Sequence, residues 1–256
     1  MTVKQILELV DHLAPFDTQD EYDNCGLLVG SPAQEVTGIL FALDVTEGVI
    51  REAVEKGASL IITHHPLMFT PRKRVTDEDY EGRIICLLIR ANLSLIAAHT
   101  CLDKAPGGIN DTLASQCGLT EVEGEEFIRV GNLPEPMTAA ALAEELSKRL
   151  GDTVRCMGPE DAVIRRVGLC SGSGSGEWEK AALLGCDAFL SGEVKHHHAL
   201  AMADRGIVAL EGGHFATEAA GIFALADALQ NAIDKIELKK RVFKSAQKAY
   251  SFPPQP

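Results

Sequence analysis

The sequence has few aromatic residues and no long apolar run. Phe, Trp and Tyr make up 5% of its 256 residues, although hydrophobic residues as a whole make up 46%. We therefore expect a core built mostly of aliphatic side chains. No apolar run reaches the roughly 18 residues of a membrane span. Lys4, Glu8 and Asp11 interrupt the N-terminal segment, which consequently lacks the apolar stretch of a signal peptide. We expect a cytoplasmic protein.

Positive charge is also scarce. The chain has 24 Lys and Arg residues against 37 Asp and Glu, which gives a formal net charge of −13. A surface of this sign repels a phosphate backbone, so the composition argues against broad nucleic-acid binding. A bound cation would still attract phosphate groups locally.

Paired cysteine motifs are absent as well. The seven cysteines are an odd number, are widely spread and never form CxxC. In a cytosolic protein we interpret such cysteines as small buried hydrophobic residues.

Predicted strands and helices alternate along most of the chain. We expect strands at 37–45, 58–65, 93–100, 164–172, 186–192 and 207–213. We expect helices at 3–14, 46–57, 77–92, 107–118, 177–185, 195–206 and 214–234. This alternation predicts an α/β protein made of βαβ units with mixed, largely parallel sheets.

The same pattern suggests two similar lobes that pack as one unit. We place the first lobe at 1–118 and the second at 164–256. Residues 119–163 contain three prolines and a helix near 138–150. We interpret them as a connecting segment, with room for antiparallel strands. The proline-rich end, 251–256, is expected to be poorly ordered.

Potential metal ligands follow three of the predicted strands. The apolar run LIIT leads into His64 and His65, and Pro66 favours an extended conformation at His65. The strand at 93–100 leads to Asp103, and the strand at 207–213 leads to His214 and Glu218. His214 and Glu218 are four residues apart, so on a helix they share one face. Each motif also has a simpler explanation. His64 and His65 could be surface histidines at a turn, and Asp103 could be a turn or capping residue. Glu218 could merely interact favourably with the helix dipole.

Taken together, these residues predict a dinuclear metal site. We expect all three strand ends to meet at one edge of a sheet, where ligands bind in parallel α/β folds. Three histidines with two carboxylates suit Zn, Fe or Mn better than Ca or Mg, which prefer oxygen ligands. Five ligands are too many for one catalytic zinc with an open position, so we predict two divalent ions that share a carboxylate.

Three further segments are weaker candidates. Asn24 precedes the apolar LLVG and is able to donate a hydrogen bond towards a ligand, although an ordinary turn is the simpler explanation. The loop SGSGSG at 171–176 follows a strand and precedes a helix, which is typical either of an anion-binding nest or of a flexible turn. It lacks the lysine of a Walker A loop. Of the consecutive His196, His197 and His198, we expect at least two to face solvent.

With these segments in place, the sequence resembles the dinuclear metal-centre family known as YbgI-like or Nif-three-like, also called GTP cyclohydrolase I type 2. The resemblance extends over nearly the whole chain. It rests on DNCGLLVG (23–30), THHPLMF (63–69), AHTCLDKAPGGIND (98–111), SGSGSG (171–176), SGEVKHHHAL (191–200) and EGGHFATE (211–218).

The resemblance implies that the metal ligands are His64, His65, Asp103, His214 and Glu218, with Glu218 as the bridge. It implies that His99 is an additional ligand or a close neighbour of the metals. It also implies two α/β lobes with the metal pair in the cleft between them, and assembly into a homohexameric ring. With about 45 residues between the lobes, the chain resembles the short form of the family, without an inserted domain. It departs from the family pattern at Cys25, Cys101 and His198, where other residue types are usual.

The function implied is a metal-dependent hydrolase that acts on a nucleotide or phosphoester through a metal-activated water. His99 or His197 would be the general acid or base. Substrate contacts would come from Asn24 and from the loop residues Ser171, Gly172, Ser173 and Gly174. The alternative is a non-enzymatic metal-binding or metal-delivery protein, or a ring-shaped scaffold. We expect a small-molecule substrate and no membrane partner.

Overall fold

The chain builds two sheets, each in a separate unit. The computed structural model describes residues 1–235 and 241–248, so the expectation for 251–256 lies outside the described residues. The first unit contains residues 1–105 and the described residues from 222 onward, and the second contains residues 106–221. The chain therefore leaves the first unit once and returns to it within the long helix α9 (His214–Lys235).

The first unit has a five-stranded sheet in the order β1-β4-β3-β2-β11. The β2, β3, β4 and β11 strands run parallel, and β1 pairs with β4 in the antiparallel direction. The strand bounds are β1 (Gly26–Val29), β2 (Gly38–Ala42), β3 (Leu60–Thr63), β4 (Ser94–Ala97) and β11 (Arg241–Lys244). All residues of β2, β3 and β4 are buried, as expected of parallel strands covered on both faces.

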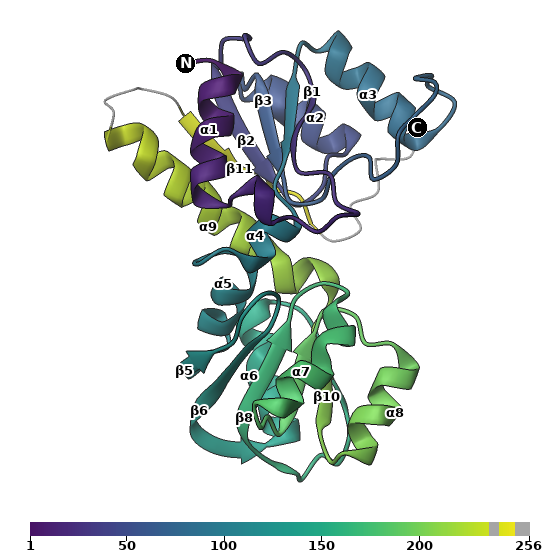
Figure 1. The fold of residues 1–256 in the computed structure, drawn as a ribbon, viewed down its shortest axis with the longest axis vertical. Coiled ribbons are helices and arrows are strands. Elements are labelled where there is room, and N and C mark those ends of the chain that lie inside the picture. Colours follow the sequence, from purple (N-terminus) through teal and green to yellow (C-terminus); the bar gives the residue numbers. More distant parts are fainter. Residues whose placement is uncertain (236–240, 249–256) are drawn as a thin grey trace. The chain divides into compact units, whose positions relative to one another are not determined.

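Helices cover both faces of this sheet (Figure 1). They are α1 (Val3–Leu13), α2 (Glu47–Glu55) and α3 (Tyr80–Arg90), with the C-terminal part of α9; a short 3₁₀ turn, η1 (Phe16–Thr18), and the short helix α4 (Thr100–Lys104) complete the unit. The α2 and α3 helices pack on the face that carries Leu40, Ile61 and Leu95. Side-chain caps fix the starts of these helices: the Thr46 hydroxyl accepts from Val49 N–H, and the Asp79 carboxylate accepts from Gly82 N–H.

The second unit has a six-stranded sheet in the order β5-β6-β8-β9-β10-β7. The central strands β8, β9 and β10 are parallel, whereas β5, β6 and β7 pair in the antiparallel direction. The bounds are β5 (Thr120–Glu123), β6 (Arg129–Thr138), β7 (Arg155–Met157), β8 (Val163–Cys170), β9 (Ala188–Ser191) and β10 (Val208–Glu211). Both sheets are thus mixed, and the predicted α/β class is confirmed.

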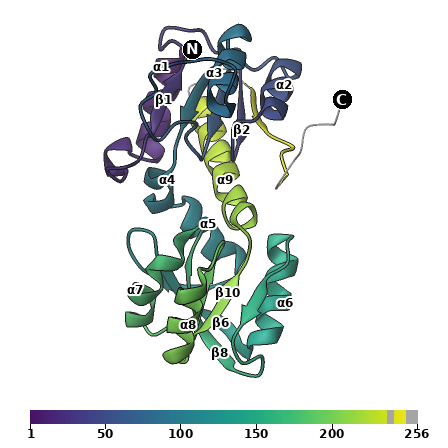
Figure 2. The ribbon, with the colours of Figure 1, turned by 90° about the vertical axis from the view of Figure 1, so that its right-hand side faces the viewer.

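Two helical layers enclose the second sheet. The helices are α5 (Ile109–Gln116), α6 (Ala139–Leu150), α7 (Trp178–Leu183) and α8 (His196–Asp204), with the 3₁₀ turn η2 (Gly174–Glu177). Leu190 of β9 packs with α5 and α6, while its neighbour Phe189 packs with α7 and α8. Figure 2 shows α7 and α8 on one side of the strands and α6 on the other. This alternation follows from the two-residue period of a strand.

The units differ from the predicted boundaries at 118 and 163. Residues 119–163 supply β5, β6, α6 and β7, so they are part of the second sheet and not a connecting segment. Pro134 and Pro136 lie within β6, although proline cannot donate to a β-ladder. The structure accommodates them within β6 by a shift in register between Asn132 and Met137.

The described helices include α9, with 22 residues. Within residues 1–235 and 241–248, no helix is both long and apolar enough to cross a membrane.

Candidate metal centre

Three histidines gather at the carboxyl ends of two neighbouring parallel strands in the first unit. His64 and His65 directly follow β3, and His99 follows β4 by two residues. The His64 ring centroid lies 5.0 Å from that of His65 and 5.0 Å from that of His99. One nitrogen from each ring lies within 4.8 Å of the other two, close enough for the three to hold one ion. The predicted grouping at this sheet edge is therefore present for β3 and β4.

Asp103 lies beside this group. It belongs to α4, and its Oδ1 atom is 3.5 Å from His64 Nε2. Both side chains are buried. A carboxylate oxygen and imidazole nitrogens at such separations form the donor set that zinc, iron and manganese take in proteins. The residues present thus fit a divalent transition metal.

Each imidazole of the group is oriented through its Nδ1 atom. His64 Nδ1 lies 2.9 Å from the Ala98 carbonyl oxygen, and His65 Nδ1 lies 2.7 Å from Asp44 Oδ1. His99 Nδ1 lies 2.9 Å from Asp23 Oδ1. A carbonyl or carboxylate oxygen only accepts, so Nδ1 carries the proton and Nε2 presents its lone pair. Metal-binding histidines show this arrangement, in which an oxygen fixes the tautomer and the ring orientation.

Asp23 connects several parts of the group. Its carboxylate accepts from Thr100 N–H at 2.9 Å and from the Thr100 hydroxyl, in addition to its pairing with His99. Burial raises the pKa of the Asp23 carboxyl, but the hydrogen bonds from His99 and Thr100 outweigh burial, so the pKa lies well below its usual range. Asp23 therefore remains a carboxylate and holds the start of α4, which carries Asp103.

The second unit carries a histidine–carboxylate pair on the first turns of α9. His214 Nε2 lies 3.1 Å from Glu218 Oε2, four residues later on the same helix face. Glu218 is buried and His214 is partly exposed. His214 Nδ1 lies 2.8 Å from Glu193 Oε1, so this ring is oriented as the other three are.

Gly172 lies directly against this pair. Its φ is +55°, and a Cβ atom at this position would be 2.0 Å from Glu218 Oε1 and 3.1 Å from His214 Nε2. Only glycine has both the conformational freedom and the lack of side chain that this position requires.

Three N–H groups of the loop that contains Gly172 already have partners within the protein. Ser171 N–H donates to Asn110 Oδ1, Gly172 N–H donates to Thr217 Oγ1, and Gly174 N–H donates to the Ser171 carbonyl. The main local contribution of the loop is thus to pack against the ligand pair. Ser173 is exposed.

The expectation that three strand ends meet at one sheet edge is wrong for β10. That strand, which precedes His214, belongs to the second sheet, whereas β3 and β4 belong to the first. The sequence pattern of strand followed by ligand is the same in all three cases. It does not reveal which strands pair, because pairing depends on contacts between distant segments.

Two other predicted residues have clear local environments. The Asn24 amide donates to the Met68 carbonyl at 2.7 Å, which fixes the loop after His65. His197 lies on α8, exposed, with its ring centroid 4.2 Å from that of His198. His196 is exposed as well, so the expectation that at least two of these three histidines face solvent is confirmed.

Sequence reasoning missed the carboxylates that orient the imidazoles. Asp44 follows β2 and Glu193 follows β9, each within two residues of the strand end. The signal that identified the ligands, a polar residue directly after a buried parallel strand, also applied to these two residues. Asp23 was visible only as part of the DNCG segment before β1.

Comparisons with known proteins show the family to which the chain is related. A family model described as Duf34/NIF3 (NGG1p interacting factor 3) matches residues 1–249. A Clostridium perfringens protein named GTP cyclohydrolase 1 type 2 homolog is 32% identical and covers 98% of this chain and 100% of its own. A Helicobacter pylori protein named GTP cyclohydrolase 1 type 2 is 31% identical and covers 90% of this chain and 92% of its own.

Solved structures show the same fold. A hypothetical protein of Staphylococcus aureus has a TM-score of 0.93 at 29% identity, and covers 99% of both chains. The protein ybgI, described as of unknown function, has a TM-score of 0.87 at 27% identity, and covers 98% of this chain and 100% of its own.

Proposed function

Because the chain belongs to the Duf34/NIF3 family, we propose that it is a metal-dependent hydrolase that acts on a nucleotide or a phosphoester, as a GTP cyclohydrolase 1 type 2 would. The observation that carries this proposal is the shared orientation of four imidazoles. An oxygen atom faces Nδ1 in His64, His65, His99 and His214, so each Nε2 is prepared to accept a cation. The relatives' names support the choice of substrate class.

We propose that the metal ligands are His64, His65, Asp103, His214 and Glu218, for two divalent ions of zinc, iron or manganese. When bound, such a pair lowers the pKa of a water molecule and neutralises charge on a phosphate or carbonyl oxygen. Glu218 has two carboxylate oxygens and is buried, which suits a bridging role.

In this proposal the protein residues contribute orientation and proton transfer. His99 is the better placed general acid or base, because Asp23 orients its ring through Nδ1 and the ring lies next to His64 and His65. His197 is the second candidate and would act from α8. Asn24 and the loop residues Ser171 to Gly174 remain the proposed substrate contacts.

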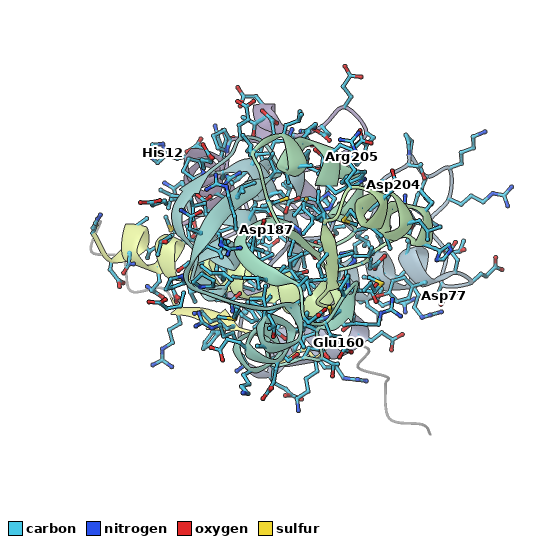
Figure 3. All side chains as sticks on the ribbon, turned by 90° about the horizontal axis from the view of Figure 1, so that it is seen from below. His12, Asp77, Glu160, Asp187, Asp204 and Arg205 are labelled. Atoms are coloured by element: carbon cyan, nitrogen blue, oxygen red, sulfur yellow. The ribbon has the colours of Figure 1, made fainter. Side chains whose placement is uncertain are left out.

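Metal content tests the proposal most directly. Wild type, Glu218→Gln and the control Glu160→Gln are purified without chelator, and metal per chain is measured by elemental analysis. Glu160 is exposed, belongs to the second unit and is labelled in Figure 3. We expect about two ions per chain in wild type and in the control, and a marked loss in Glu218→Gln. Wild type that takes up no zinc, manganese or iron even after reconstitution would refute the proposal.

Turnover separates an enzyme from a metal carrier. The loaded protein is incubated with guanosine triphosphate, other nucleotides and model phosphoesters. Hydrolysis that disappears in His99→Gln while metal content persists supports the enzyme. Readily exchanged metal without turnover of any substrate supports the metal-delivery alternative instead.

We also propose a homohexamer. Light scattering on the purified chain tests it, since the mass of 27.5 kDa per chain predicts a sixfold larger particle.

A further inference from the structure

Two cysteines lie side by side within the first unit. Cys25 precedes β1, Cys101 belongs to α4, and their Sγ atoms are 3.5 Å apart. The Cys101 thiol donates a hydrogen bond to Cys25 Sγ. An S–S bond is about 2.05 Å long, so the sulfurs need to approach by only about 1.5 Å to form a disulfide.

The surrounding contacts hold the Cys25 sulfur in place. Cys25 N–H donates to the Gln19 side chain at 2.7 Å, and His99 N–H donates to Cys25 Sγ at 3.3 Å. The Cys25 thiol also lies 3.3 Å from Asp23 Oδ2. Cys25 and Cys101 are 76 residues apart in sequence, but the fold places their thiols in direct contact.

Exposure gives the two sulfurs different roles. Cys101 is buried and Cys25 is partly exposed, so a reagent from solvent reaches Cys25 first. Among the described residues, neither thiol belongs to a group of side chains that could hold a metal ion. The direct contact between the two sulfurs therefore favours a disulfide as the product of their chemistry.

We propose that Cys25 and Cys101 form a reversible disulfide through exchange with a low-molecular-weight disulfide. The Cys25 sulfur attacks one sulfur of the small disulfide and releases the first small thiol. The Cys101 sulfur then attacks Cys25 in the resulting mixed disulfide and releases the second. The protein loses two electrons and two protons, which leave on the two small thiols.

The disulfide changes the hydrogen bond from His99 N–H to Cys25 Sγ. As the sulfurs approach, Cys25 Sγ moves relative to His99 N–H, and α4 moves through Cys101. Asp103 lies on the same short helix, two residues after Cys101. Oxidation is therefore coupled to metal affinity, a consequence that rests on the proposed function. By linkage, metal binding changes the disulfide equilibrium by the same factor.

The test begins with thiol mapping of the full chain. Metal-free protein is equilibrated with mixtures of oxidised and reduced glutathione, unreacted thiols are alkylated, and intact and peptide masses are measured. The variants are Cys25→Ser and Cys101→Ser, with Cys86→Ser as a control because Cys86 is partly exposed on α3.

We expect wild type and Cys86→Ser to form one internal disulfide that reduced glutathione reverses. Cys101→Ser should stop at a glutathione adduct on Cys25, and Cys25→Ser should not react at Cys101. Wild type that keeps both thiols alkylatable, or that stops at the adduct, would overturn the proposal. This result depends on wild type alone, so a variant that fails to fold does not obscure it.

Zinc titration of the reduced and oxidised forms tests the coupling. We expect the affinity to differ about tenfold or more, as happens when support around a ligand is altered. Equal zinc affinities of the two forms would refute the coupling but not the formation of the disulfide. Absence of zinc binding in both forms would instead refute the proposed function, because the disulfide is measured without metal.

Discussion

At the scale of single residues, the candidate centre depends on groups that do not themselves bind metal. Asp44, Asp23 and Glu193 each face the Nδ1 atom of a histidine at 2.7 to 2.9 Å. A carboxylate in this position fixes the ring and increases the electron density at Nε2. In the proposed metal site, these carboxylates would therefore contribute to ligand strength through the histidines that they orient.

Asp44→Asn tests this contribution at His65. The amide keeps the shape of the side chain but removes the negative charge that faces His65 Nδ1, so we expect zinc affinity to fall about 10- to 100-fold. Calorimetric titration of the metal-free protein measures it. Asp77→Asn is the control, since Asp77 is exposed and lies at the periphery in Figure 3. Equal affinities in the two variants would contradict the assigned role of Asp44.

Gly172→Ala tests the close contact with the α9 pair. The new Cβ atom would meet Glu218 Oε1, so Glu218 must move and metal affinity must fall. Positive φ alone costs a non-glycine residue about 1–3 kcal/mol. Gly206→Ala is the matched control, because its φ is +72° but no atom lies within 4 Å of the added Cβ. Both variants should lower the melting temperature, whereas only Gly172→Ala should weaken zinc binding.

Among the helices, α4 depends on contacts with a distant segment of the chain. It has only five residues, and the His99 side chain gives it no N-terminal cap. Thr100 N–H is instead satisfied by Asp23, which comes from the segment before β1. The position of Asp103 therefore depends on a hydrogen bond across 77 residues of sequence.

Asp23→Asn tests this hydrogen bond through the pH dependence of protein stability. The folded pKa of Asp23 lies below the unfolded value of about 3.9, so its stabilising contribution is present above about pH 4 and is lost as pH falls further. In the metal-free protein we expect the variant to be about 1–3 kcal/mol less stable than wild type at pH 7. Urea unfolding at several pH values should show the gap closing below about pH 4. A gap independent of pH would show that the Asp23 charge contributes nothing.

At the scale of the whole molecule, each unit has its own apolar core. Two clusters lie entirely within residues 113–210, and a third lies within the first unit, where Phe243 of β11 joins residues 29–95. No cluster among these mixes residues from both units. Because a core of this kind supports independent folding, the contiguous second unit is the natural fragment to isolate.

The fragment 106–221 should therefore fold by itself. We expect helical circular dichroism and one cooperative thermal transition, although the fragment ends at the unit boundary within α9. The control is the same fragment with Phe189→Ala, which removes a fully buried side chain and should lower the free energy of unfolding by about 3–5 kcal/mol. A broad, non-cooperative transition in the unmodified fragment would contradict independent folding.

Local sequence patterns were enough to predict the α/β class and to identify the candidate ligands. Helix and strand periods are local, and the step from LIIT into His64 and His65 places imidazoles at a strand end whatever the strand pairs with. The residues of β6 were harder to interpret, because Pro134 and Pro136 obscure a strand whose ladder is completed by β8.

The contacts between distant segments became apparent in the folded chain. The fold placed β10 in the second sheet, brought Asp23 to His99 and Thr100, and set Cys25 against Cys101. It also gave Gly172 its role, since the need for glycine there comes from Glu218, 46 positions later in the sequence. These contacts join residues far apart along the chain, and local periodicity contains no information about which distant strands, helices and loops will pack together.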